Sequence, residues 1–204
     1  ILDYCETNVV DAVDYLYEIQ TLNVSLGGSA YSMVNLLGSH DTPRLLTLFN
    51  GDIDRALLAW VLLLTAVGIP LIYYGDELGM LGDNDPDCRR PMAWDKEEKN
   101  SRIWYVIHQL LSLRKNSKAL THGTFAPLFS FIGLAAFKRQ YQDEEIIVVI
   151  NTREDVQRIR VPVQSERISY QDVFSGSTVD TSDGYLNYKV FPGHQFRIYS
   201  SVHV

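Results

Sequence analysis

The sequence predicts an α/β domain followed by an all-β domain. In residues 1–120, apolar runs of strand length alternate with segments of helical period, a pattern typical of a parallel sheet or barrel. Beyond about residue 120, short β-branched or aromatic runs follow one another between turn residues, which is typical of an antiparallel β-sandwich. Because the change falls near residues 118–124, we assign 1–120 to the first domain and 121–204 to the second.

The first domain is expected to contain three helices and two strands. Apolar residues recur on a helical period over residues 9–20, and the short apolar run 31–37 predicts a buried strand. Asp52 can cap a helix that runs to about residue 66 and is buried on more than one side, because nearly all its faces are apolar. A second buried strand is predicted over 69–74 and a last helix over 97–116.

Residues 56–74 contain no charged residue, and their length is close to the roughly 20 residues of a membrane span. Gly68-Ile69-Pro70 interrupts this run. A proline inside a helix removes a hydrogen bond and clashes with the preceding turn. We therefore favour a buried helix followed by a strand, and we expect no membrane span.

The second domain is expected to contain short strands separated by turn residues. The turn signals lie at residues 142–144, 175–177, 182–184 and 191–193. The predicted strands are 134–141, 146–151, 158–163, 170–174, 185–190 and 195–199.

Composition excludes some classes of partner. The chain has 204 residues, of which 46% are hydrophobic and 21% charged, and 18 basic against 25 acidic residues give a net charge of −7. An acidic chain without a basic run has no electrostatic reason to bind nucleic acid or an anionic membrane.

The two cysteines, Cys5 and Cys88, are too few for a disulfide scaffold and favour a cytoplasmic location. Since the chain begins with Ile1, without Met or a leader, we expect a piece of a longer protein.

Two polar loops follow the predicted strands, at residues 38–44 and 75–94. Functional groups of parallel α/β folds lie on loops after the carboxyl ends of the strands. In the first loop, His40-Asp41 is compatible with a polar turn, a catalytic pair or part of a metal site. A metal site needs at least three ligands, and no His/Cys cluster lies nearby in the sequence. The structural and catalytic interpretations are favoured over the metal site, and all three stay open.

The second loop begins with Gly75, Asp76 and Glu77. Adjacent carboxylates repel each other unless a cation or hydrogen-bond donors intervene. They could form an acid/base pair, but we favour a structural role, with Arg44, Arg89 or Arg90 as the cation.

Residues 83–90 alternate Asp and Asn, as calcium loops do, but lack the glycine and the terminal glutamate of an EF-hand. Asp, Asn and Arg side chains also present the fixed donors and acceptors that sugar hydroxyls need. Tyr74 and Trp94 could offer faces to a sugar ring, although aromatic side chains more often belong to a core.

Three motifs resemble the alpha-amylase family of glycoside hydrolases. Residues 35–44 (NLLGSHDTPR) resemble its fourth conserved region, and residues 68–77 (GIPLIYYGDE) resemble its segment on the eighth barrel strand. Residues 84–92 (NDPDCRRPM) are similar to the neopullulanase, cyclomaltodextrinase and maltogenic amylase branch. The resemblance implies a C-terminal fragment: the last strand–helix units of a (β/α)8 TIM barrel, with 31–37 as strand seven and 69–74 as strand eight, followed by the family's C-terminal β domain.

The resemblance also implies a retaining hydrolase of α-1,4 glucosidic bonds, with α-1,6 bonds as a second option, acting on maltodextrins, cyclodextrins or pullulan. By position, Asp41 matches the carboxylate that stabilises the transition state, and His40 matches the histidine that contacts the same sugar. Asp85 and Arg89 match residues that contact the next sugar. The motif Gly75, Asp76 and Glu77 is taken as architectural.

One departure from the family limits what this chain does. The family's nucleophile and acid come from strands four and five, and no segment here resembles those motifs. We therefore expect this chain to be inactive alone and to hold no metal, with calcium possible only in the upstream part. An incomplete barrel exposes strand edges and apolar faces. The segment 57–64 should then lose partners, and the barrel part should self-associate or need the missing half, while the β domain folds independently.

Two other function classes compete with an enzyme. A non-catalytic amylase-like protein would be indicated by altered residues at positions 40 and 41, and both are intact. A carbohydrate-binding module would need an exposed aromatic row in residues 121–204. The tyrosines there are better explained as core or turn residues: Tyr141, Tyr170, Tyr185 and Tyr188.

Overall fold

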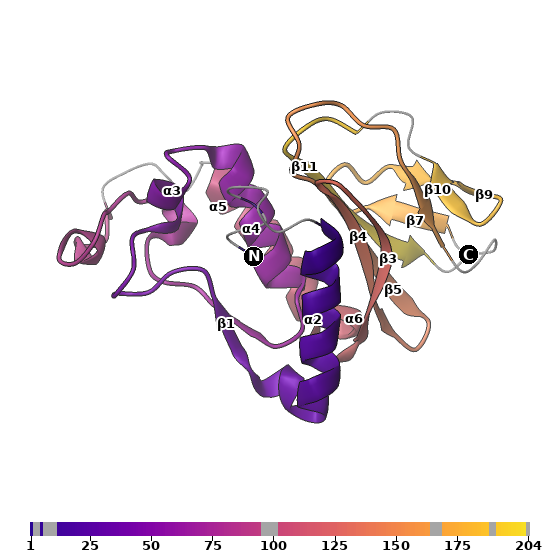
Figure 1. Ribbon diagram of the computed structural model, residues 1–204, viewed down its shortest axis with the longest axis horizontal. Helices are drawn as coiled ribbons and strands as arrows, with labels where there is room; N and C mark the ends of the chain where they lie inside the picture. Colours follow the sequence, from indigo (N-terminus) through magenta and orange to yellow (C-terminus); the bar gives the residue numbers. More distant parts are fainter. Residues whose placement is uncertain (2–4, 6–11, 95–101, 164–168, 188–190, 203–204) are drawn as a thin grey trace.

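The computed structural model describes residues 1, 5, 12–94, 102–163, 169–187 and 191–202. The first half contains helices and a two-stranded sheet that lies beside them, and the second half is all β (Figure 1). Its elements are the helices α2 (Ala12–Leu26), α3 (Leu45–Leu48), α4 (Ile53–Thr65), α5 (Arg102–Asn116) and α6 (Lys118–His122), the 3-10 helices η1 (Gly27–Ser32), η2 (Asp76–Leu78) and η3 (Asp87–Arg89), and the strands β1 (Val34–Leu36) and β2 (Ile69–Leu71).

The second half forms two antiparallel sheets. The larger has the order β3-β4-β5-β11-β7-β8, and the smaller has the order β6-β10-β9. The strands are β3 (Thr124–Phe131), β4 (Leu134–Tyr141), β5 (Glu144–Asn151), β6 (Arg160–Pro162), β7 (Ser169–Asp172), β8 (Thr178–Val179), β9 (Thr181–Ser182), β10 (Tyr185–Asn187) and β11 (Gln195–Val202). The predicted fold class, α/β followed by an antiparallel β-sandwich, is confirmed.

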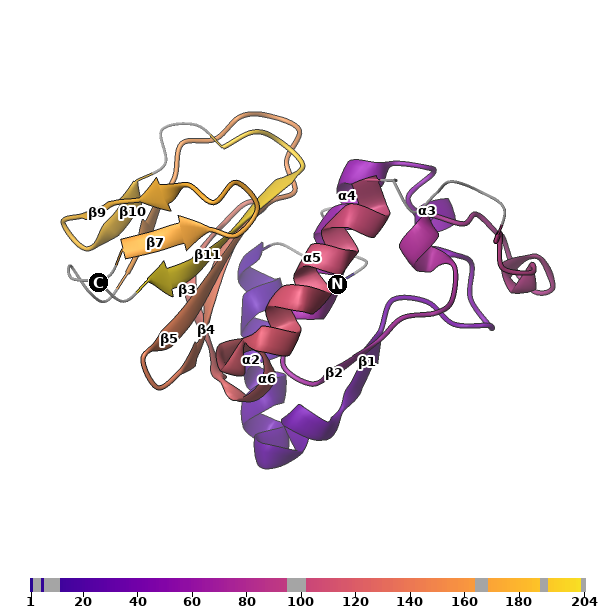
Figure 2. The same ribbon diagram turned by 180° about the vertical axis from the view of Figure 1, so that it is seen from behind.

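The two faces of β4 and β5 serve different cores because side chains alternate along a strand. Ala135 and Phe137 belong to the core shared with the helices. Leu134 and Ala136 belong to the core between the two sheets. The large sheet therefore stands between the helical layer and the small sheet (Figure 2).

Helix α4 begins as predicted. Asp52 is its N-cap, and the Asp52 side chain accepts a hydrogen bond from the Arg55 amide at 3.1 Å. Every residue from 57 to 64 is at most 1% exposed. The expectation that this segment loses its partners is therefore wrong. The reason is that α4 packs against α5 on one side and against the large sheet on another, so that its apolar faces stay covered.

Strands β1 and β2 run parallel, with Val34 opposite Ile69 and Leu36 opposite Leu71. Both are shorter than the predicted runs 31–37 and 69–74, because Tyr31 lies in η1 and the chain after Leu71 turns into the loop that reaches η2. The expected burial is also wrong, since these four side chains are 43–51% exposed. Within the described part of the chain each strand pairs only with the other, so that no further strand covers them.

Other differences are local. Strand β3 was not predicted: it contains Pro127, which lacks an amide donor, and its pairing with β4 shifts register between Pro127 and Phe129. Such a proline is tolerated because β3 lies at the edge of the sheet.

Helix α2 continues past the predicted end at residue 20, to Leu26. Residues 9–11, 97–101 and 188–190 of the predicted elements lie outside the described residues. Among the described helices, none has both the length and the apolar character that crossing a membrane requires.

Two buried arginines hold the carboxyl end of α4. Arg114 of α5 donates to the carbonyls of Leu64 (2.9 Å), Ala66 (3.0 Å) and Gly68. Arg139 of β4 donates to the carbonyl of Thr65 at 2.6 Å, and also to Gly123 and Thr124.

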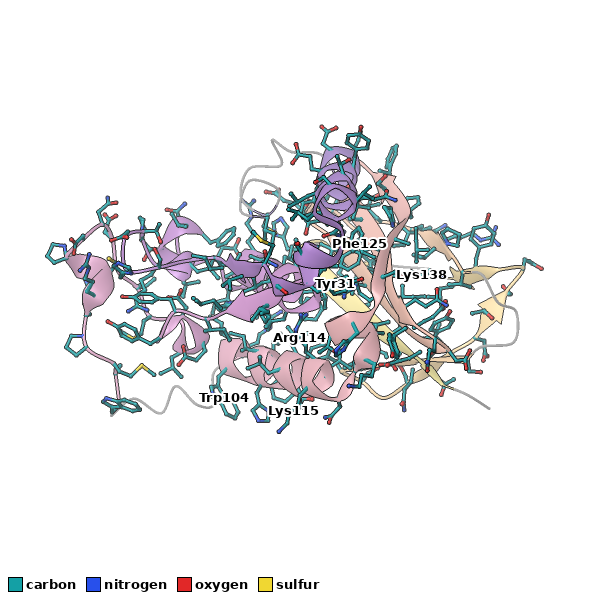
Figure 3. The ribbon with its side chains drawn as sticks, turned by 90° about the horizontal axis from the view of Figure 1, so that it is seen from below. Tyr31, Trp104, Arg114, Lys115, Phe125 and Lys138 are labelled. Carbon is teal, nitrogen blue, oxygen red and sulfur yellow. The ribbon has the colours of Figure 1, made fainter. Side chains whose placement is uncertain are left out.

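Cations are favourable at this end of a helix because its last carbonyls lack partners. Burial, together with the charge of Arg114, lowers the pKa of Arg139 to about 10. Figure 3 shows Arg114 near Tyr31 and Phe125, at the junction of the helices and the sheet. Arg139 of the β domain thus holds the end of α4, and Arg114 of α5 holds the residue that precedes β2.

Candidate active site

The loops that follow β1 and β2 meet at one end of the molecule. Parallel pairing brings the carboxyl ends of the two strands to the same edge. The Arg44 amide donates to the Gly82 carbonyl at 2.8 Å, and the Gly82 amide donates to Thr47 Oγ1 at 2.9 Å. The segment that carries η3 extends from this edge, away from the β-sandwich (Figure 1).

The structure brings the four predicted substrate-contacting residues together. Asp41 Oδ2 lies 3.2 Å from His40 Nε2, and Asp41 Oδ1 accepts a hydrogen bond from Arg89 Nη2 at 3.2 Å. Arg89 Nε lies 3.0 Å from Asp85 Oδ1. Arg89 therefore joins the two aspartates, which come from different loops. A cation shared in this way reduces the repulsion between two carboxylates and fixes their spacing.

Side chains of the second loop bind the main chain of the first loop. The His40 carbonyl accepts hydrogen bonds from Cys88 Sγ at 3.2 Å and from Arg89 Nε at 3.1 Å. Cys88 is fully buried. Cys88 could not be selected as a site residue by sequence reasoning, because its contact runs from a thiol to a backbone oxygen 48 positions away.

The polar cluster itself is open to solvent. The side chains of His40 and Asp41 are 62% and 67% exposed, and Asp85 and Arg89 are about half exposed. Carboxylate, imidazole and guanidinium groups in a fixed arrangement can exchange hydrogen bonds with the hydroxyls of a polyol. The cluster thus exposes donors and acceptors of the kind that a hydroxyl-rich ligand can use.

A buried ion pair lies behind this surface. Arg44 Nη1 is 3.1 Å from Asp76 Oδ1 and also donates to the Tyr74 carbonyl. The Arg44 and Asp76 side chains are 0% and 2% exposed. The rings of Tyr73 and Tyr74 lie 4.4 and 4.7 Å from the Arg44 guanidinium carbon, within range of a cation–π interaction. The pair therefore ties the loop after β1 to the loop after β2.

Of the three cations considered for Asp76 and Glu77, Arg44 is the partner of Asp76. Arg89 and Arg90 pair instead with Asp41, Asp85 and Asp87. Gly75, which precedes the pair, has φ of +87°, and a side chain there would collide with the Met80 sulfur. Only glycine adopts this conformation without strain. The motif is thereby bent so that Asp76 points inward.

The Asp76 carboxyl should titrate in a measurable range. Burial raises its pKa to about 6, against the opposing influence of Arg44. From about pH 4 to about pH 6 the folded chain then keeps a proton that the unfolded chain, with an ordinary pKa near 3.9, has released. Stability from this group is full below about pH 4 and is lost as the pH rises through 6, by up to about 3 kcal/mol. Urea unfolding measures the free energy of unfolding of the wild type and of Asp76→Asn across this pH range. The wild type should lose up to about 3 kcal/mol relative to the variant as the pH rises. An equal pH dependence of the two proteins would contradict a raised pKa at Asp76.

The carboxylates of the loop 83–90 contact groups of the loop itself. Asp87 Oδ2 accepts from the Asp83 amide at 2.8 Å, and Asp87 Oδ1 accepts from Arg90 Nε at 2.7 Å. These hydrogen bonds lower the pKa of Asp87. Within the described residues, no three His, Cys, Asp or Glu side chains converge in a metal-binding group. The carboxylates of this loop hold the loop's own backbone and arginines.

The two aromatic candidates lie differently. The Tyr74 hydroxyl donates to the Arg90 carbonyl at 2.8 Å and its ring contacts Arg44, so that Tyr74 serves the scaffold. Trp94 is 80% exposed and remains available to a ligand.

Two polar loops lie at the carboxyl edge of a parallel strand pair, and two antiparallel sheets lie behind the helices. This arrangement places the chain in the class of α/β folds that carry their functional groups on the loops after the strands. A family profile described as "Alpha amylase, catalytic domain" matches residues 4–102, and one described as "Alpha-amylase C-terminal domain" matches residues 123–190. The chain belongs to the alpha-amylase family.

Individual relatives agree with this assignment. The chain is 51% identical to a cyclomaltodextrinase of Thermoanaerobacter pseudethanolicus over 119 residues, which are 58% of this chain and 21% of that protein. It is 38% identical to neopullulanase 2 of Thermoactinomyces vulgaris over 167 residues, which are 80% of this chain and 28% of that protein. The chain thus spans between about a fifth and somewhat more than a quarter of the length of these relatives.

A solved structure supports the fold. The alpha-amylase of Geobacillus thermoleovorans, complexed with acarbose, superposes with a TM-score of 0.85 at 26% identity. The superposition covers 98% of this chain and 45% of that chain. More than half of that enzyme therefore has no counterpart in these 204 residues.

Proposed function

We propose that this chain is the C-terminal part of a retaining α-glucan hydrolase, and that Asp41 is its transition-state-stabilising carboxylate. The observation that carries the proposal is the placement of Asp41 at a strand end, with one oxygen on His40 and the other on Arg89. The substrates proposed are maltodextrins, cyclodextrins or pullulan, cleaved at α-1,4 bonds. The names of the relatives and the acarbose complex of a structural neighbour support this class.

In the proposed reaction the glucosidic bond is cleaved by double displacement. A nucleophilic aspartate and an acid glutamate act from barrel strands outside these residues. Asp41 accepts hydrogen bonds from hydroxyls of the distorted sugar, and these bonds strengthen as oxocarbenium character develops. His40 donates to the same sugar. Asp85 and Arg89 contact the neighbouring sugar, and their link to Asp41 holds the two subsites at a fixed spacing.

The proposal has three further parts. The chain alone is inactive and either self-associates or requires the remaining barrel segments. The residues here need no metal of their own, since the Asp83–Asp87 carboxylates are taken up by backbone amides and arginines. The protein acts in the cytoplasm, in keeping with two free, buried cysteines.

A chimera tests the proposed function. The 119-residue matched segment of the Thermoanaerobacter cyclomaltodextrinase is replaced by the corresponding segment of this chain. The chimera should hydrolyse β-cyclodextrin with kcat/KM within about tenfold of the parent, because the polar cluster is supplied intact. A folded chimera, verified by its thermal transition, that cleaves no α-glucan would contradict the proposal.

A further inference from the structure

The carboxylate proposed to stabilise the transition state lies on an exposed loop. The side chains of His40 and Asp41 are 62% and 67% exposed. An exposed side chain keeps much of its rotational freedom, so that its precise placement depends on the main chain that carries it. Placement matters for the reaction because a displacement of about 1 Å can cost about 10²-fold in rate. The contacts that anchor the main chain of His40 and Asp41 therefore bear on catalysis.

The main chain of this loop is anchored to the second loop at one atom. Within the loop, the Ser39 amide donates to Thr42 Oγ1 at 2.9 Å and the Asp41 amide donates to Ser39 Oγ at 3.2 Å. These bonds shape the loop but do not attach it elsewhere. In the part of the chain that the structure describes, the main-chain atoms of residues 40 and 41 form hydrogen bonds with another segment only through the His40 carbonyl. This carbonyl therefore links the position of Asp41 to the second loop.

The two donors to the His40 carbonyl differ in exposure. Arg89 Nε lies at 3.1 Å, but the Arg89 side chain is 45% exposed and also pairs with Asp41 and Asp85. In the proposed function Arg89 contacts a sugar, so that its bond to the carbonyl competes with water and with substrate. Cys88 Sγ lies at 3.2 Å, and Cys88 is fully buried. The bond from Cys88 is therefore the one that neither water nor substrate can replace.

The backbone that carries Cys88 is itself closely packed. A Cβ added to Gly82 would lie 3.0 Å from Cys88 Cα and 2.8 Å from the Asp87 carbonyl oxygen. The two arms of the second loop thus approach each other as closely as a glycine allows. On another side, the hydroxyl of Tyr73, two residues after β2, donates to the Cys88 carbonyl at 3.5 Å. The thiol therefore extends from a fixed backbone to the loop that carries Asp41.

We propose that Cys88 is a positioning residue, whose thiol holds the His40 carbonyl and thereby orients the Asp41 carboxylate toward the sugar. The inference rests on the proposed function. Cys88 contacts neither the sugar nor the reacting atoms. A buried cysteine can instead act as a small apolar side chain, and its loss would then lower stability without changing the rate constant for bound substrate. Serine and alanine distinguish the two roles, because serine keeps a hydrogen-bond donor and alanine has none.

Steady-state kinetics of Cys88→Ala and Cys88→Ser in the cyclomaltodextrinase chimera test the proposal. Alanine should lower kcat for β-cyclodextrin by about tenfold or more and change KM less than about threefold, because the carboxylate is displaced while most ground-state contacts of the sugar remain. Serine should restore kcat to within about threefold of the parent chimera. The matched control is Thr47→Val, which removes the hydrogen bond to the Gly82 amide between the same two segments at nearly constant shape. Its kcat should stay within about twofold, and urea unfolding measures the stability of each variant.

A second measurement needs no activity. In the 204-residue chain with Cys5→Ala, Cys88 is the one remaining thiol, and its infrared S–H stretching band should lie at lower frequency in the folded than in the unfolded chain, because the thiol donates to a carbonyl.

The outcomes separate the positioning role from the proposed function. A folded chimera with Cys88 intact that cleaves no α-glucan contradicts the proposed function, and the positioning role falls with it. In an active chimera, an unchanged kcat in Cys88→Ala overturns the positioning role alone. An equal loss of kcat in the alanine and serine variants, or in Thr47→Val, also overturns it, because packing would then explain the effect. A thiol band at the same frequency in the folded and unfolded chain overturns it as well.

Discussion

Replacing Asp41 by Asn in the cyclomaltodextrinase chimera is expected to lower kcat for β-cyclodextrin by about 10³-fold or more. Asparagine keeps the shape of the side chain but removes the charge that opposes the positive charge developing on the sugar. Loss of a single preorganised electrostatic contact typically costs about 10²–10³ in kcat, and a full charge facing an oxocarbenium-like state should exceed the lower figure. Because the interaction strengthens in the transition state, kcat should fall much more than KM rises.

The control for Asp41→Asn is Asp83→Asn in the same chimera. Asp83 is an exposed aspartate of the second loop whose carboxylate accepts from the Asn84 amide, and its substitution should change kcat less than about threefold. Steady-state kinetics with β-cyclodextrin and maltotriose measure both variants. An Asp41→Asn chimera that keeps a tenth of the parental kcat would show that Asp41 is only a structural member of the cluster.

Replacing Arg44 by Met is expected to destabilise the 204-residue chain by about 3–5 kcal/mol. The substitution leaves Asp76 as a buried carboxylate without its cation, which is the costly way to break a buried ion pair. It also removes the contacts of the guanidinium with the rings of Tyr73 and Tyr74. Urea unfolding at pH 7, followed by tryptophan fluorescence and by circular dichroism, measures the loss.

Arg90→Met provides the comparison for Arg44→Met. Arg90 pairs with Asp87 at 2.6 Å, but the two side chains are exposed by 54% and 38%. Exposed pairs contribute about 0–1 kcal/mol. Equal effects of the two substitutions would contradict the view that burial makes the Arg44–Asp76 pair the connection between the loops.

Much of the fold is predictable because its signals are local. The Asp52 cap and the apolar faces of α4 lie within one segment, and the strand limits of β4 follow from its turn residues. The predictions that failed depended on distant partners. The burial of residues 57–64 comes from a sheet that lies about 80 positions later in the chain, and the exposure of β1 and β2 comes from the absence of neighbouring strands among the described residues. Neither is a property of the segments themselves.

The candidate site divides in the same way. His40, Asp41, Asp85 and Arg89 were selected by motif, and the structure brings them together. The contacts that support these four residues were harder to predict from the sequence. Arg44 was one of three arginines that could face Asp76, and only the folded chain distinguishes a buried partner from two exposed ones. The Cys88 contact with the His40 carbonyl involves a backbone oxygen, which no pattern of side chains reveals.

The central claim is that these 204 residues hold one of the carboxylates needed for hydrolysis and not the complete set. Release of reducing sugar from β-cyclodextrin by the purified chain tests this claim most directly, with Asp41→Asn beside it. The account predicts no release above buffer from either protein. Hydrolysis by the wild type that Asp41→Asn abolishes would contradict it, because a nucleophile and an acid would then lie within this chain, with Asp76, Glu77 and Asp85 as the first residues to test.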